Sequence, residues 1–490
     1  MEIATQNQLQ FFSLIALFLY FGVLLWIVTK EKKNQNMLDY FFGGRKMPFW
    51  ALSITFIASW WGAGSALSTA DLAFHDGMGA FWYYGMPVLI STFLMILGAK
   101  TIRRIGYLTQ GEMMKARYSP LAATLQSFLI LVFMTTTAAS QMVGLGDFFG
   151  TYMGLSYEAA IFLGTGIVLI YSVFGGFRGV VLTDIIQFVL MFLSALIVFI
   201  VTFQQAGGWK EIEQEALLRG KEHFMCFSAG AEKYISYVIT FGCAWAIQAN
   251  VWQRISATKN NADARKITIM SFLVFIPLYL IVVFTGMAGL PLFSTLPEGG
   301  VVTSVVVQYM PPMLGAFVFV GISAAIMSTM DSLINTGAMT FTLDLCPSQW
   351  HEQRKLMISR LATFLITAVA LVISLSVRSI LEVSWIASDI ITTGVFIPLL
   401  VGFVWRRGNS HGAVCSMIVG FLFCLCNHLI ILLDLQLPFL WEQHSTTQVL
   451  VGVTLSVVTY VVASLLTEPE FEKADAFIMA SRRMRTNKSI

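Results

Sequence analysis

The segment SAAIMSTMDS, residues 323–332, places oxygen-bearing side chains inside an otherwise apolar stretch. Three hydroxyls and one carboxylate fall within about 1.5 turns of a helix, on Ser328, Thr329, Asp331 and Ser332. An isolated serine or threonine in such a helix usually bonds back to its own backbone, but this does not account for four such side chains in five residues. Because oxygen ligands suit hard cations, the segment predicts a site for a small hard cation.

Further aspartates interrupt apolar stretches at Asp147, Asp184 and Asp389. A charged side chain surrounded by hydrocarbon is costly and usually marks a site or a buried pair. Asp389 is explained equally well by a structural hydrogen bond to a neighbouring hydroxyl, and Asp147 by its nearness to a predicted interface. Arg254 lies near the end of an apolar stretch and is interpreted as an anchor at the inner interface.

The apolar segment ASWWGAGSALSTADLAF, residues 58–74, contains Gly62 and Gly64 beside small residues. Glycine lowers helix propensity, so the helix is predicted to unwind there. Backbone in mid-membrane can unwind only where it lines a cavity or is covered by protein, and its freed carbonyls are good cation ligands. The alternative is a helix-packing face made of small residues.

The composition indicates the class of protein in which these groups lie. Of 490 residues, 57% are hydrophobic and 12% are charged, whereas a soluble domain carries about 25% charged residues. The chain is therefore predicted to be an all-α polytopic membrane protein. A formal net charge of +3 predicts no nucleic-acid partner, and the six scattered cysteines predict no disulfide framework. Because no His/Cys cluster has zinc spacing and no GxSxG or P-loop motif occurs, no enzyme is predicted.

Thirteen apolar segments are long enough to cross the hydrocarbon core, numbered from 0 to 12. The first lacks the basic flank and the small-residue cleavage site of a secretory signal, so it is predicted to remain a helix. The polar gap at 205–229 has room for a short amphipathic piece only. The segments are 9–29, 47–74, 79–99, 120–149, 157–176, 179–204, 230–253, 268–290, 313–343, 357–377, 380–403, 411–433 and 446–467.

The lysines and arginines predict the orientation, because inner loops are enriched in them. With the N-terminus outside, nearly all of the 30 basic residues fall on inner segments and on the tail, so the C-terminus is predicted to be cytoplasmic. The exceptions are Lys210, Arg219, Lys221, Lys233 and Arg378. One missed or added span would invert every later loop and destroy this split.

Four motifs resemble those of the sodium:solute symporter family, and the resemblance covers residues 40–430. The motifs are YFFGGRKMPFW (40–50), GGFRGVVLTDIIQ (175–187), WQRISATKN (252–260) and SAAIMSTMDS (323–332). The resemblance implies a leucine-transporter-like fold with inverted five-helix repeats, here 47–204 and 230–403. The additions would be an N-terminal helix at 9–29, two helices at 411–467 and a tail at 468–490. It also implies binding sites near the midplane, where helices 1 and 6 are interrupted, and function as a monomer.

The resemblance also implies the ligands of the coupling ion, Na+. The main sodium site would use three backbone carbonyls and two hydroxyls, from Ala58, Trp61, Ala325, Ser328 and Thr329. Some members have a second sodium site nearer the cytoplasm, which would here use Asp184, Asp331 and Ser332 together with Ser328. The sequence leaves coupling to one or to two sodium ions open.

Within the family, helix 1 (ASWWGAG) and helix 10 (SWIASDIITTG, residues 384–394) resemble the choline-transporter branch most. Trp60 would then face the solute and offer a ring to a cation. However, Thr137, Pro87 and Gln248 stand where other cage aromatics are expected, and a cage with one wall binds a quaternary ammonium weakly.

The residues assigned to the solute are Trp60, Gln141, Trp245 and Gln248, whose two glutamines suit a polar or zwitterionic solute. Trp82, Tyr83 and Tyr84 on helix 2 are further aromatic candidates for the solute, and the alternative for Tyr83 and Tyr84 is a place in the interface belt or the core. The predicted function is sodium-coupled import of a small polar organic solute. Choline uptake and a passive uniporter or channel are the alternatives, and a sensor is a lesser one. Without an outer N-x-S/T sequon, the location predicted is a plasma membrane, in particular the bacterial inner membrane.

Overall fold

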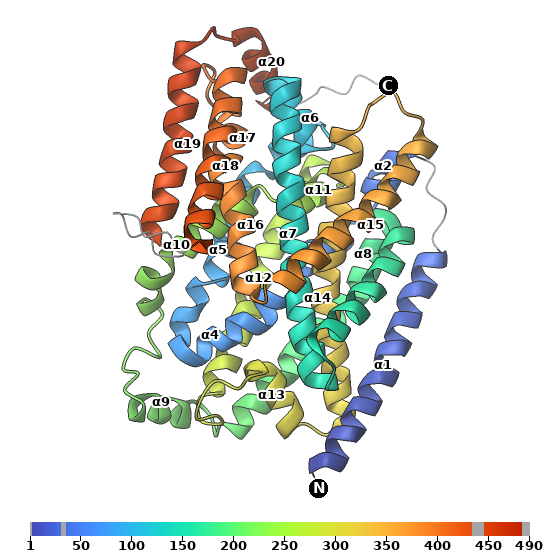
Figure 1. Cartoon of the computed structure of the whole chain (residues 1–490), viewed down its shortest axis with the longest axis vertical. Helices are drawn as coiled ribbons and strands as arrows, with labels where there is room; N and C mark the ends of the chain where they lie inside the picture. The colour runs from blue at the N-terminus through green and yellow to red at the C-terminus, as the bar shows by residue number, and fades with distance from the viewer. Residues whose placement is uncertain (1, 31–35, 434–444, 483–490) are drawn as a thin grey trace.

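The computed structural model describes residues 2–30, 36–433 and 445–482, and these residues form helices joined by short loops. The start of α1 and the last helix, α20, lie at opposite ends of the bundle (Figure 1). Parts of the predicted inner loop after helix 0, of the outer loop between helices 11 and 12, and of the tail lie outside the described residues.

Most of the bundle is built from long helices. These are α1 (Glu2–Lys30), α5 (Gly85–Ile105), α7 (Pro120–Met153), α8 (Tyr157–Gln205), α12 (Asn261–Ala288), α14 (Pro312–Thr340), α15 (Glu352–Ser376), α18 (Ser410–Leu432) and α19 (Thr446–Leu466). Three pairs of shorter helices follow one another along the chain: α3 (Phe49–Ala58) and α4 (Thr69–Asp76), α10 (Ala229–Ala246) and α11 (Ala249–Ser256), α16 (Ile380–Gly394) and α17 (Phe396–Val401). The short remaining helices are α2 (Met37–Phe42), α6 (Gln110–Arg117), α9 (Trp209–Leu218), α13 (Gly300–Tyr309) and α20 (Phe471–Arg482).

By length and composition, nine helical segments of the described residues could cross a membrane, fewer than the thirteen predicted. The difference has a structural cause. Predicted helices 1, 6 and 10 are interrupted, and the outer half of helix 1 runs on into helix 2. Predicted helices 4 and 5 are joined in α8 at Gly176, whose φ of 54° is accessible to glycine, and the first arm is short. Each predicted segment therefore has a helical counterpart, although nine helical segments of the described residues are long and apolar enough to cross a membrane.

Helix α14 forms the centre of the bundle, because every residue from Val318 to Thr340 is buried. A helix that is buried on every side lies in the interior of the bundle. Helices α1, α7, α8 and α15 pack around it. Large apolar side chains such as Phe18 and Trp26 on α1 point outward instead, as expected for a surface covered by lipid. The chain is a multi-pass membrane protein.

Helix 1 is interrupted at the predicted place. Helix α3 ends at Ala58, and a π-helical turn, Gly64–Ser68, leads into α4. A Cβ at Gly62 would lie 2.0 Å from Oε1 of Gln141, and a Cβ at Gly64 would lie 2.3 Å from the hydroxyl of Tyr84. Both glycines are therefore required for the close approach of these side chains. The sequence-based prediction of an unwound segment is confirmed.

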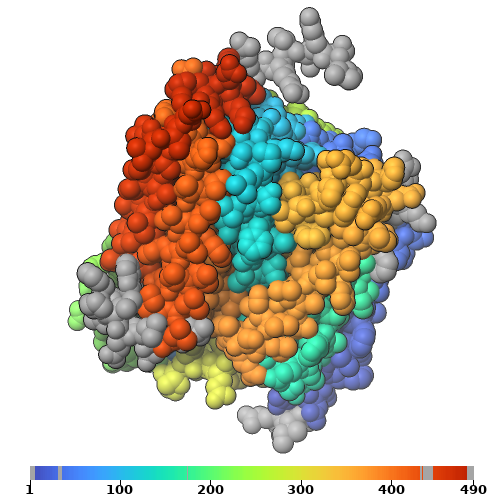
Figure 2. Space-filling view, turned by 45° about the horizontal axis from the view of Figure 1, so that its top comes forward, coloured from blue at the N-terminus to red at the C-terminus, as the bar shows by residue number. Residues whose placement is uncertain are grey.

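Helices α18 and α19 pack side by side at the edge of the bundle and lie against α7 and α16 (Figure 2). The hydroxyl of Thr393 on α16 donates to the carbonyl of Gly420 on α18 at 3.0 Å. A Cβ at Gly420 would lie 2.0 Å from the Thr393 carbonyl oxygen. This glycine therefore sets the separation and the register of the two helices.

We predict that Gly420→Ala destabilises the protein by about 1–3 kcal/mol, because the new methyl group collides with backbone that cannot move aside. The measurement is thermal unfolding of the purified protein in detergent. Gly166→Ala on α8 is the control, because nothing lies within 4 Å of its added Cβ. Equal melting temperatures for Gly420→Ala and the wild type would contradict the close packing of α16 on α18.

Candidate functional site

A small cavity lies where the interrupted helices α3–α4 and α10–α11 meet. Its volume is about 30 Å³, which is room for about one water molecule. The four residues that the sequence assigns to a solute, Trp60, Gln141, Trp245 and Gln248, all line it. The other lining residues are Ser59, Gly62, Gly64, Ser65, Tyr84, Val88, Thr137 and Thr329. No charged side chain is among these lining residues.

Aromatic rings form one side of this cavity. The ring centroids of Trp60 and Trp245 are 6.1 Å apart, and those of Tyr84 and Trp245 are 4.9 Å apart. Phe275 packs behind Trp60, with centroids 5.9 Å apart. Of the helix 2 aromatic candidates, Tyr84 lines the cavity, whereas Trp82 and Tyr83 are not among its lining residues. Tyr83 points elsewhere and packs against Tyr237.

Two glutamine side chains accept hydrogen bonds from N–H groups beside the cavity. The Trp60 indole Nε1–H donates to Oε1 of Gln248 at 2.5 Å, and the Ala63 backbone N–H donates to Oε1 of Gln141 at 2.8 Å. The Ala63 N–H lies at the start of the helical run that leads into α4, where the helix dipole favours negative charge. Each amide oxygen therefore occupies a position that could also hold a carboxylate oxygen.

The residues predicted for the main sodium site come from two elements that the fold brings together. The Thr329 hydroxyl on α14 donates to the Ala58 carbonyl at the end of α3, at 3.1 Å. Trp61 and Ala325 both line a neighbouring cavity of about 20 Å³. The Ser328 hydroxyl donates to Asp184 on α8. Oxygen atoms of α14 thus lie against the unwound part of helix 1.

The residues predicted for a second sodium site are all buried, but they face different partners. Asp184 accepts hydrogen bonds from Ser328 and from Thr55. Asp331 instead accepts one from Ser172 on α8. The Ser332 hydroxyl oxygen accepts one from Arg254 at 2.6 Å. The bridging role of Thr55 has no signal in the sequence.

The interpretation of Arg254 as an interface anchor is wrong. Its side chain is 1% exposed, and its guanidinium lies 3.8 Å from the carboxylate of Asp184. It also donates to the Asn250 carbonyl at 2.9 Å and lies over the Phe177 ring at 5.4 Å. The sequence does not distinguish the two roles, because a basic residue at the inner end of a helix is expected in either case. One fixed positive charge therefore sits among the residues predicted to bind a second sodium ion.

The family model for the sodium:solute symporter family matches residues 40–420. The chain belongs to this family. Similar proteins include the osmoregulated proline transporter OpuE of Bacillus subtilis, 27% identical over 83% of this chain and 87% of the relative. The sodium/pantothenate symporter of Haemophilus influenzae is 24% identical over 95% of this chain and 98% of the relative.

Solved structures show the same fold. One is a substrate-bound, outward-open Na+-coupled sialic acid symporter, with a TM-score of 0.76, 19% identity and coverage of 94% of this chain and 98% of that chain. Another is Mhp1, a nucleobase-cation-symport-1 family transporter in a closed conformation, with a TM-score of 0.59, 11% identity and coverage of 90% and 97%. The fold is therefore leucine-transporter-like, as the resemblance implied.

Membership of the sodium:solute symporter family makes this chain a sodium-coupled symporter of a small solute that works by alternating access, and not an enzyme. Sodium is then a transported coupling ion rather than a resident cofactor. The alternative predictions of a passive uniporter and of a sensor do not agree with this family. The similar proteins OpuE and the Haemophilus symporter transport proline and pantothenate, which corrects the assignment to the choline branch.

We predict that Asp184→Asn and Arg254→Gln each destabilise the protein by about 3–5 kcal/mol, because each leaves one buried charge without its partner. The double variant should be less destabilised than the sum of the two, since neither charge then remains. Thermal unfolding of the four proteins in detergent measures the coupling. Strictly additive shifts would contradict the pairing of Asp184 with Arg254.

Proposed function

We propose that this symporter imports a small zwitterionic solute that carries a carboxylate, together with one sodium ion. The observation that carries the proposal is the cavity at the two helix breaks. It is lined by aromatic and uncharged side chains only, and the oxygen atoms of α14 lie beside it. A cationic solute would lose its hydration there next to the sodium ion and without a protein counter-charge, which is costly. A zwitterion next to a sodium ion meets this requirement.

The sodium ion would bind between the unwound part of helix 1 and α14. Its proposed ligands are the carbonyls of Ala58, Trp61 and Ala325 and the hydroxyls of Ser328 and Thr329. Support comes from the Thr329 contact with Ala58 and from the donation by Ser328 to Asp184. A hydroxyl that donates to an anion keeps its oxygen lone pairs free for a cation and is polarised toward it.

Coupling to a single ion follows from the position of Arg254. Its guanidinium already supplies the positive charge that Asp184 needs and engages Ser332. A second cation at this place would be repelled by the guanidinium at close range. The second sodium site predicted at Asp184, Asp331 and Ser332 is therefore proposed to be filled by a side chain of the protein.

The solute carboxylate would take the place of the Gln141 amide oxygen at the Ala63 N–H and lie near the sodium ion. Its cationic or apolar part would lie on the rings of Trp60, Trp245 and Tyr84. Since the cavity holds about 30 Å³, the glutamine side chains must turn away as the solute enters. Both proline and pantothenate, the compounds that similar proteins transport, carry a carboxylate, and proline is a zwitterion of suitable size.

A quaternary ammonium solute such as choline is the second candidate. The observation in its favour is that Trp60, Trp245 and Tyr84 all line the cavity, so the cage has more than the single wall that the sequence indicated. Against it, none of the residues that line the cavity carries a carboxylate to balance a bare cation. A betaine, which has both groups, would satisfy the rings and the charge balance together.

The proposed topology has thirteen transmembrane helices, with the N-terminus outside and the C-terminus cytoplasmic. The opposite positions of the start of α1 and of α20 support it (Figure 1), as does the distribution of lysine and arginine. The two repeats, residues 47–204 and 230–403, would rock against each other as one functional monomer. Bacterial relatives support a location in the cell membrane of a bacterium.

The sodium assignment predicts the behaviour of a Ser328→Ala, Thr329→Ala double variant. Loss of two oxygen ligands should raise the sodium concentration for half-maximal uptake by about tenfold or more. The measurement is solute uptake into proteoliposomes as sodium is varied, and the wild-type Hill coefficient for sodium should be close to one. Ser323→Ala is the matched control, because this buried hydroxyl on the same helix donates back to the Phe319 carbonyl at 2.6 Å.

Two results of this measurement would overturn the proposals separately. Unchanged sodium dependence in the double variant would remove the two hydroxyls from the ion site. A wild-type Hill coefficient near two would contradict coupling to a single ion.

The solute assignment predicts that Trp60→Ala weakens solute affinity by about 1–2 kcal/mol, because a cationic group loses the ring on which it stacks. Trp60→Phe should recover part of this loss, whereas Trp60→Leu should not. Uptake competition with proline, glycine betaine, choline and proline methyl ester measures the solute class. Trp26→Ala, on the outward face of α1, is the control.

The zwitterions should compete, and the ester, which has lost its carboxylate charge, should not. Choline competing better than every zwitterion would favour the second candidate. Wild-type affinity in Trp60→Ala would place the solute elsewhere.

A further inference from the structure

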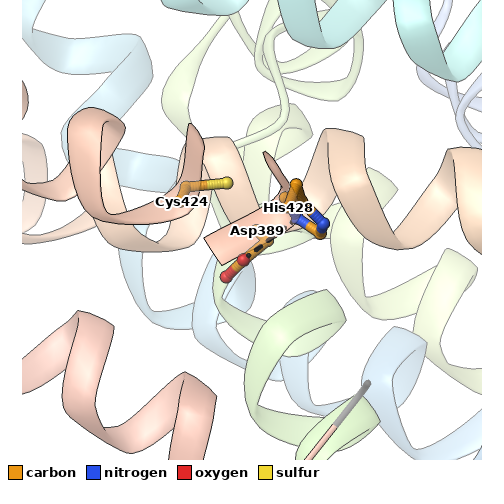
Figure 3. A group of neighbouring side chains, drawn as sticks. All are labelled: Asp389, Cys424 and His428. Atoms are coloured by element: carbon orange, nitrogen blue, oxygen red, sulfur yellow. Dashed lines mark ion pairs between the residues drawn. The ribbon is translucent and has the colours of Figure 1, made fainter. Parts of the chain in front are cut away.

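Three side chains with metal-binding atoms converge where α16 meets α18, away from the solute cavity (Figure 3). They are Asp389 on α16 and Cys424 and His428 on α18. One oxygen, the sulfur and one ring nitrogen all lie within 4.8 Å of one another. Asp389 and Cys424 are buried, and the His428 side chain is 16% exposed. We call these three residues the α16–α18 cluster.

The packing of the two helices creates this cluster. The contact of Thr393 with Gly420 fixes their register. Asp389 is one turn before Thr393, and Cys424 is one turn after Gly420, so two helices that run in opposite directions bring them face to face. His428 is a further turn along α18, and residues four apart share one face of a helix.

The carboxylate of Asp389 lacks the partners that a buried charge requires. The Cys424 thiol is the hydrogen-bonding neighbour of this carboxylate. By the stricter geometry of a normal hydrogen bond, neither oxygen has a partner among the described residues, and the Nε2 atom of His428 has none either. These atoms approach each other to 3.4 Å, as an ion-pair contact only. The structural interpretation of Asp389, a hydrogen bond to a neighbouring hydroxyl, is therefore wrong. Buried polar atoms without partners are rare in proteins, and three such atoms lie together in the α16–α18 cluster.

We propose that the α16–α18 cluster binds a borderline transition-metal ion of the Zn²⁺ type. Thiolate, imidazole and carboxylate are the ligands that zinc prefers, and three protein ligands leave a fourth position for water. A hard monovalent ion such as sodium does not favour sulfur. In a tetrahedral complex the ligand atoms lie about 3.5 Å apart, so the present spacing of up to 4.8 Å requires a closure of about 1 Å.

Charge balance favours the same ion. In the loaded site Cys424 binds as a thiolate, Asp389 as a carboxylate and His428 as a neutral ring, so the sum with a divalent cation is zero. A neutral complex is the one that low-dielectric surroundings disfavour least. As the metal–sulfur bond forms, the sulfur–hydrogen bond breaks and its proton passes to water. The partly exposed ring of His428 provides the entry point.

Metal at this place would restrain the transport cycle. On α16 the hydroxyl of Thr392 donates to the Thr240 carbonyl on α10 at 2.7 Å. The Trp385 ring of α16 lies 6.0 Å from Phe241, which stacks at 4.8 Å on Trp245 in the cavity wall. A metal that staples α16 to α18 would hold this wall in place. Bound Zn²⁺ should therefore slow sodium-dependent uptake, a part of the inference that rests on the proposed solute site.

The binding test uses the purified full chain, without solute. Zn²⁺ titration monitored by thermal unfolding should raise the melting temperature of the wild type, and desalted protein should retain one zinc per chain. Co²⁺ in place of Zn²⁺ should give a thiolate-to-cobalt charge-transfer band. Cys424→Ser should abolish the band, and His428→Ala should weaken zinc binding by about tenfold or more.

Cys426→Ser is the matched control, because this exposed thiol lies on the same helix and outside the cluster. It should bind both metals as the wild type does. Sodium-dependent uptake without zinc should be unchanged in Cys424→Ser, which also shows that the variant folds. Equal zinc affinity in the wild type, Cys424→Ser and His428→Ala would overturn the site. If zinc binds at the cluster but does not change uptake, the binding site stands and the proposed restraint on transport is overturned.

Discussion

In hydrocarbon, a helix can be interrupted only where neighbouring protein satisfies the backbone groups that the break sets free. The whole binding region of this symporter follows from that constraint. At the break in helix 1, the Ala63 N–H is satisfied by Gln141 of α7, and the Ala58 carbonyl accepts a hydrogen bond from Thr329 of α14. The Asn250 side chain of α11 reaches the same stretch of backbone. The side chains that stabilise the break are thus the ones that, in the proposed mechanism, exchange partners with a solute and an ion.

A second consequence concerns charge. Asp184 lies next to the proposed ion site and receives hydrogen bonds from Ser328 and Thr55, while Arg254 supplies an opposite charge. The carboxylate therefore connects α3, α8, α11 and α14 through one buried network. A change at the Ser328 hydroxyl alters the electrostatic interaction between Asp184 and Arg254, because interactions between buried charges are poorly screened. This gives ion binding a direct route to the inner halves of helices 1 and 6.

The aromatic layer links the cavity to the edge of the bundle. Rings from Trp60 through Trp245 and Phe241 reach Trp385 on α16, and α16 in turn packs closely on α18 at Gly420. Closely packed elements move together rather than deform. A peripheral contact between α16 and α18 can therefore act on the proposed solute site, although α18 contributes no residue to the cavity lining.

Sequence reasoning alone predicted the membrane class, the helical segments, the break at Gly62 and the oxygen-rich face of α14. These features depend on composition and on local residue order, which a single chain displays directly. The partner of each buried polar group, by contrast, became visible only when the helices were packed together. The sequence predicted Arg254 to be an interface anchor, and only its packing between α11 and α14 shows the buried pair with Asp184. The sequence also left Tyr84 open between the solute cavity and the belt or core, and the packing of helix 2 on helix 1 places it at the cavity. Likewise, Cys424 and His428 alone do not indicate a metal site in the sequence. The packing of α16 on α18 adds Asp389 and completes a group of three possible ligands. Such pairings join residues far apart along the chain, and their register is fixed by close contacts between helices that no local pattern records.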